Sequence, residues 1–160
     1  MKLEPESVDA FLSRFFFFED GSIVGVSLEL QPATEVRVII TIDAMESSRT
    51  AIADSVSATG DIVWRKVRMT IEGVSAYRFL ASERFTYNTL SDGIQLAVGP
   101  NECVLDLNPA IGDDWSPTTP GSGSWSAQQV FSAIDSDGIN GECTRQFVVG
   151  KSISIEVSSI

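Results

Sequence analysis

The chain is 160 residues long, which suits a single domain at 1–160 that buries roughly 70% of the surface its unfolded form exposes. It has no histidine and two cysteines, which removes Ser-His-Asp and Cys-His catalysis and a structural zinc site, and we expect no metal and no cofactor. A formal net charge of −11 argues against binding to nucleic acid or anionic membranes. The charge either maintains solubility or forms an acidic face for a basic partner.

The start of the chain predicts a short helix. In residues 5–17, Ser7 can cap the helix N-terminus, and apolar side chains recur at helical spacing, namely Val8, Phe11, Leu12 and Phe15. The run Phe15–Phe18 then leads to the turn signal at Asp20 and Gly21, and a first strand is the alternative for this opening. This apolar run is far too short to span a bilayer and no secretory signal precedes it, so we expect a cytoplasmic protein.

The remaining chain alternates apolar and polar residues with a period of two, which is typical of half-buried antiparallel strands. We expect strands at residues 23–30, 35–43, 61–72, 74–80, 94–98, 103–107 and 146–157. Pro32 separates the first two strands into a hairpin, and Gly73 bends or bulges the long third one. The connection at 99–102 makes a second hairpin. In the last strand the odd positions point inward, with Lys151 at an edge or bend.

Two segments are predicted to be loops. Residues 44–60 are rich in Ala, Ser and Thr, and residues 108–126 are rich in Pro, Gly and Ser. Residues 127–134 fit either a short helix or a strand. The whole pattern predicts a mainly β fold, an antiparallel β-sandwich or strongly curved sheet of about seven to nine strands with a short N-terminal helix against it.

The long loop at 108–126 carries the candidate site. Trp115 and Trp125 are large aromatic residues among Gly, Ser and Pro, and Trp is the residue most enriched at binding hot spots. With Asp113 and Asp114 beside them, they would form an acidic-aromatic contact surface for a partner. The alternative is that both rings fold back and close an open end of the sheet.

Other constellations give weaker signals. Residues 135–142 look like a calcium loop, but Ile139 and Asn140 occupy the positions where an EF-hand needs an oxygen ligand and a glycine, so an Asp/Gly turn is the better interpretation. Paired carboxylates such as Asp135 and Asp137 could hydrolyse glycosides only if a cleft separated them, which the sequence does not indicate. Cys103 is expected to be a buried free thiol rather than a reactive cysteine.

One region is basic, and its side chains are Arg65, Lys66, Arg68, Arg78 and Arg84. Arg68 alternates with apolar neighbours and should point outward. We expect cross-strand pairing of these bases with carboxylates, and a small anion site is the alternative.

A resemblance supports a binding role. Residues 64–74, followed by Tyr77-Arg78-Phe79 and the closing residues 149–156, resemble small β-rich bacterial proteins of uncharacterised function, some of which are similar to immunity proteins of toxin systems. The similarity covers about half the chain and rests on strand patterns with a Gly-Val bend. It implies a bacterial cytosolic protein that works by binding, and it carries over no functional residue.

The sequence therefore predicts a non-enzymatic binding protein that masks a basic protein partner, as an inhibitor or immunity protein does. A small-ligand or carbohydrate-binding module, with hydrolytic activity as an open option, is the alternative from another class. Self-association into a homo-oligomer through edge strands is a third.

Overall fold

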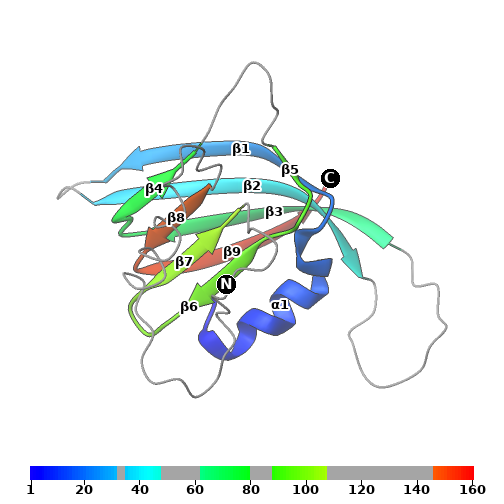
Figure 1. Cartoon of the computed structure of the whole chain (residues 1–160), viewed down its shortest axis with the longest axis horizontal. Helices are drawn as coiled ribbons and strands as arrows, with labels where there is room; N and C mark the ends of the chain where they lie inside the picture. Colours follow the sequence, from blue (N-terminus) through cyan, green and yellow to red (C-terminus); the bar gives the residue numbers. More distant parts are fainter. Residues whose placement is uncertain (32–34, 48–61, 80–87, 108–145) are drawn as a thin grey trace, which may run out of the picture.

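The computed structural model describes residues 1–31, 35–47, 62–79, 88–107 and 146–160. Within these ranges, Figure 1 shows two antiparallel sheets stacked on each other and one short α-helix beside them. Side chains from both sheets and from the helix join one buried hydrophobic cluster, so the layers share a core. The predicted mainly β fold with a short N-terminal helix is confirmed.

Among the described residues, the larger sheet has five strands in the order β5 (Thr89–Leu90), β1 (Gly21–Leu30), β2 (Val36–Ser47), β3 (Ile62–Glu72) and β9 (Ser152–Ser159). The β1–β2 hairpin is confirmed. The prediction of a loop from residue 44 was wrong, because β2 continues to Ser47, and Ala44 and Glu46 are buried where they pair with β3. The rest of that predicted loop, to residue 60, lies outside the described residues.

The inner face of this sheet follows from the two-residue period. Alternate positions of β2, β3 and β9 face one another in register, and their side chains are buried: Val38, Ile40 and Ile42 with Ile71, Met69 and Val67, and then Ile153 and Ile155. The other face carries Arg37, Thr41, Asp43, Lys66 and Arg68. Arg68 points outward as predicted.

The second sheet has four strands within the described residues, in the order β4 (Ala76–Arg78), β8 (Phe147–Gly150), β7 (Cys103–Asp106) and β6 (Gln95–Val98). The β6–β7 hairpin is confirmed, with the Gly99 amide donating to the Glu102 carbonyl at 2.7 Å. Here the expectation of half-buried strands was wrong. Val104 and Val149 are buried on the face opposite the core, so these apolar runs are buried on both sides.

Two glycines let the chain pass from one sheet to the other. Gly73 has a φ of +59° and joins β3 to β4, which confirms the predicted bend. Gly150 ends β8, and the chain then turns at Lys151 into β9. The Lys151 amide donates to the Glu72 carbonyl at 2.8 Å. The single strand predicted over 146–157 is therefore two strands in different sheets. The inward positions change parity at this turn, from Val148 to Ile153.

The N-terminal segment crosses the edge of the core in three short pieces, a 3₁₀ turn (Pro5–Ser7), α1 (Val8–Arg14) and a second turn (Phe16–Phe18). Before them, the Leu3 amide donates to the Ile153 carbonyl at 3.0 Å and ties the terminus to β9. The predicted helix at 5–17 is thus too long. Ser7 occupies the N-cap of α1 as predicted, but its hydroxyl donates to the Glu4 carbonyl instead of capping the helix.

The helix ends because the backbone turns left-handed. Phe16, Phe17 and Phe18 have φ values of 50°, 56° and 65°, and Asp20 follows at 60°. This region costs an L residue about 1–2 kcal/mol, so a helix pattern alone cannot predict it. The turn keeps the rings of Phe15 and Phe18 fully buried, with their centroids 5.3 Å apart. Within the described ranges, no helix is long and apolar enough to cross a membrane.

Candidate functional site

The predicted contact surface of Asp113, Asp114, Trp115 and Trp125, and the whole 108–126 loop, lie outside the described residues. The same holds for the 127–134 segment and for the acidic turn at 135–142. These predictions stay predictions. Three other features of the described residues are candidate sites. They are an ion cluster between the helix and the larger sheet, a cavity on the outer face of that sheet, and an exposed aromatic turn at Phe16 and Phe17.

The ion cluster centres on Glu46, which is 8% exposed on the inner face at the end of β2. One carboxylate oxygen accepts from Arg14 Nε of α1 at 2.6 Å, and the other accepts from Arg65 Nε of β3 at 2.6 Å. Burial raises the pKa of Glu46, but the hydrogen bonds from Arg65 and Arg14 outweigh it, so the net pKa lies below its usual value. The cluster fixes the helix to the sheet and is structural.

The predicted basic region is dispersed by the fold. Arg65 pairs with Glu46 on the inner face, whereas Lys66 pairs with Asp43 at 2.6 Å on the outer face. Arg78 lies in the other sheet, and Arg84 falls outside the described residues. Pairing with carboxylates is therefore confirmed for Arg65 and Lys66, as expected from adjacent strands of opposite charge.

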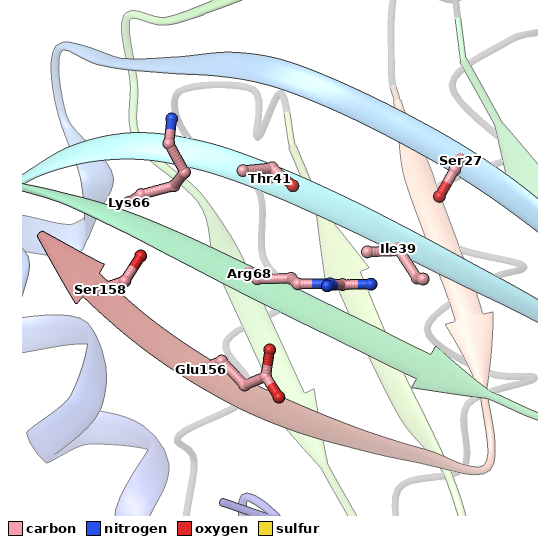
Figure 2. Close-up of a pocket in the computed structure, with 7 residues that line it drawn as sticks. All are labelled: Ser27, Ile39, Thr41, Lys66, Arg68, Glu156 and Ser158. Carbon is pink, nitrogen blue, oxygen red and sulfur yellow. The ribbon is translucent and has the colours of Figure 1, made fainter. Parts of the chain in front are cut away.

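The outer face of the larger sheet holds an open cavity of about 370 Å³, shown in Figure 2. Its walls come from β1, β2, β3 and β9, and the lining side chains are Ser27, Ile39, Thr41, Lys66, Arg68, Glu156 and Ser158. Ile39 is buried although it faces away from the core, so it forms an apolar floor. The polar groups around that floor can both donate and accept hydrogen bonds.

Arg68 is the central cation of this cavity. It is exposed and forms no salt bridge with any described residue. Glu156 lies opposite it in the β3–β9 register, and Figure 2 shows both side chains on the same face, but their charged groups do not pair. A guanidinium with free donors beside a carboxylate and hydroxyls suits reversible binding of a small polar ligand.

The exposed aromatic turn was missed by the sequence reasoning. Phe16 and Phe17 are 39% and 48% exposed, although the buried Phe15 and Phe18 flank them. The signal was present in the sequence, because four consecutive aromatic residues cannot all face one core from a single short element. Phe16 and Phe17 are followed by the exposed carboxylates of Glu19 and Asp20.

One further prediction can be judged. Cys103 is a buried free cysteine, and burial raises the pKa of its thiol to about 12, so the expectation of an inert thiol is confirmed. Cys143 lies outside the described residues. Within the described ranges, no group of His, Cys, Asp or Glu is arranged to hold a metal ion.

Comparison with protein-family models, with curated proteins and with solved structures found no match to this chain. The resemblance to immunity-like bacterial proteins therefore stays a prediction from the sequence.

Proposed function

We propose that this chain is a non-enzymatic binding protein that masks or regulates a basic protein partner through its acidic surface. The proposal keeps the predicted role of an inhibitor or immunity-like protein of the bacterial cytoplasm. It rests on one observation, the way that the described charges are paired.

The described bases are largely neutralised inside the chain. Six of them form salt bridges with carboxylates, namely Lys2, Arg14, Arg37, Arg65, Lys66 and Lys151. Several acids form no salt bridge with any described residue, among them Glu6, Asp9, Glu19, Asp20, Asp92 and Glu102. Arg68 is exposed and forms no salt bridge with any of these acids. Among the described residues, the charge that forms no salt bridge is therefore mainly negative, which favours a cationic protein.

The test is affinity capture from a bacterial lysate, with elution in a salt gradient, followed by calorimetry of the retained protein after purification. We expect retention of a basic protein whose affinity falls as salt rises, because surface charges are screened over about 8–10 Å near physiological ionic strength. The Trp115→Ala/Trp125→Ala variant tests the predicted loop contact. Retention of acidic proteins as readily as basic ones, or an empty eluate from a low-salt column, would remove the proposal.

The cavity beside Arg68 favours the alternative function, a small-ligand or carbohydrate-binding module. Its polar rim over the apolar floor of Ile39 suits a small ligand with both donors and acceptors. A thermal-shift screen of small carboxylates and sugars tests it, with Arg68→Gln as the matched variant. A ligand that raises the melting temperature of the wild type but not of the variant supports the alternative. Equal shifts in both proteins contradict it.

Self-association remains the third prediction. Val26 and Leu28 of β1 lie opposite the buried Ile40 and Val38 in the sheet register, yet both are about half exposed. Such an apolar row beside a sheet edge can pair with a second chain. Sedimentation at increasing protein concentration tests this option, and a strictly monomeric protein excludes it.

A further inference from the structure

The exposed aromatic turn has an unusual backbone. Phe16 and Phe17 are held in left-handed conformations that L residues rarely adopt, and their rings face solvent. Exposed strain of this kind persists only when surrounding structure enforces it, and it clusters at functional sites. The two rings are therefore placed at the surface by the fold.

The turn is also rigid. The Phe17 carbonyl accepts from the Ile94 amide at 2.9 Å, and the Phe18 amide donates to the Phe15 carbonyl at 2.8 Å. The Asp20 amide donates to the carbonyl of Leu90 in β5 at 3.1 Å. A preorganised aromatic pair loses little conformational entropy when it binds, which favours affinity.

Three carboxylates belong to the turn and to the segment packed against it. Glu19 and Asp20 follow it directly, and the turn that carries Asp92 packs beside it, since a Cβ on Gly93 would touch Phe17 and come within 3.5 Å of Glu19 Cγ. All three acids are exposed, and none forms a salt bridge with a described residue.

The base that precedes the turn in the chain is paired elsewhere. Arg14, at the end of α1, is committed to Glu46. Its guanidinium also lies 5.2 Å from the Phe15 ring, in a cation–π contact. The aromatic turn thus combines two exposed aromatic residues with three exposed carboxylates in the same part of the fold.

We propose that Phe16, Phe17, Glu19, Asp20 and Asp92 form a docking surface for an arginine-containing segment of a basic protein. Guanidinium groups stack on aromatic faces and pair with carboxylates, so one arginine can use both features of this surface. The inference rests on the proposed function, because it names the surface at which the basic partner is recognised. Figure 1 shows the turn at residues 16–20 between the end of α1 and the start of β1.

The test is a titration of isotope-labelled protein with a short peptide of alternating arginine and leucine, followed by NMR at low salt. The control peptide carries citrulline in place of arginine, which keeps the shape and removes the charge. We expect the amides of residues 16–20 and 91–94 to shift with the arginine peptide, and we expect much weaker shifts with the citrulline peptide.

Two variants test the residues. Phe16→Asn/Phe17→Asn removes the rings and keeps a residue type that tolerates the left-handed backbone, and we expect about tenfold weaker binding. Glu19→Gln/Asp20→Asn/Asp92→Asn removes the rim charges and should weaken binding and its salt dependence. The matched control is Val24→Ala/Leu30→Ala, which removes two exposed apolar side chains from β1 and should bind as the wild type does.

The outcomes separate the two proposals. Wild-type affinity in both the Phe16/Phe17 and the carboxylate variants, or shifts centred on another surface, would overturn this inference and leave the proposed function standing. Failure to bind both the arginine peptide and the basic proteins of the capture experiment would overturn both.

Discussion

At Gly150 the fold has no room for a side chain. A Cβ there would overlap Ile71 Cγ2 and would lie 2.9 Å from the Glu72 carbonyl oxygen, which already accepts the Lys151 amide. We expect Gly150→Ala to lower the free energy of unfolding by about 1–3 kcal/mol, because the corner between the sheets must open to admit the methyl group. Urea denaturation measures this change.

The matched control for that substitution is Gly25→Ala. The nearest atom to a Cβ at Gly25 is Thr41 Cβ at 3.8 Å, which is ordinary contact, and the φ of Gly25 is not in the left-handed region. We expect Gly25→Ala to be neutral or slightly stabilising. Equal destabilisation by the two substitutions would show that loss of glycine, and not crowding at the corner, is responsible.

Cys103 provides a second test at the level of a single residue. Burial raises the pKa of its thiol to about 12, so in a Cys143→Ser variant we expect a thiol reagent to react only after unfolding. The raised pKa of the thiol also determines the direction in which stability changes with pH. The contribution of the thiol is intact below its unfolded pKa of about 8.5 and is lost as pH rises towards the folded value. Rapid labelling of the native protein would contradict this prediction.

At the scale of elements, Glu46 joins α1 to β2 and β3. We expect Glu46→Gln to destabilise the protein by about 1–2 kcal/mol near neutral pH, because Arg14 and Arg65 lose a charged acceptor but stay partly exposed to water. The pKa of Glu46 is lowered in the fold, so its contribution is present above the unfolded pKa and is lost as pH falls through the folded value.

Urea denaturation near neutral and at acidic pH measures both effects, and the difference between wild type and Glu46→Gln should shrink in acid. Glu35→Gln is the control, since its salt bridge to Lys151 joins two exposed side chains and should contribute less than about 1 kcal/mol. A constant difference at both pH values would contradict a role for the Glu46 charge.

The elements also show how far the sequence predicts this fold. The two-residue period predicted the positions of β1, β3, the β6–β7 hairpin and most of β2, because apolar residues recur at alternate positions in these segments. It did not place the change of sheet between β8 and β9. That change depends on the close contact of Gly150 with Ile71, which are distant in sequence.

The end of the helix was missed for a related reason. Phe15 continues the helical period of α1, and local propensity does not penalise Phe16 or Phe17. Their left-handed backbone is enforced by distant partners such as Ile94, whose amide binds the Phe17 carbonyl. The predicted acidic-aromatic surface of Asp113, Asp114, Trp115 and Trp125 lies outside the described residues and stays a prediction. The surface proposed at Phe16 and Phe17 is a different one.

At the scale of the whole molecule, two neighbouring crossings of the chain connect the two sheets at one corner. The chain passes from β3 of the larger sheet to β4 at Gly73, and from β8 back to β9 of the larger sheet after Gly150; between these crossings it returns to the larger sheet at β5 and leaves it again for β6. The Ser75 amide also donates to the Val149 carbonyl at 2.9 Å, so the two crossings are hydrogen-bonded to each other. Because both sheets also contribute to one hydrophobic cluster, we expect the described core to unfold in one cooperative transition.

This expectation can be tested because each sheet offers its own probe. Trp64 lies in β3 of the larger sheet, and Cys103 lies in β7 of the smaller one. In a variant with Trp115→Phe, Trp125→Phe and Cys143→Ser, the fluorescence of Trp64 and the labelling of Cys103 report the two layers separately. Coincident urea midpoints are expected, because the layers share one hydrophobic cluster and are joined by the crossings at Gly73 and Gly150. Labelling of Cys103 at a urea concentration that leaves the Trp64 signal native would mean that the smaller sheet opens first.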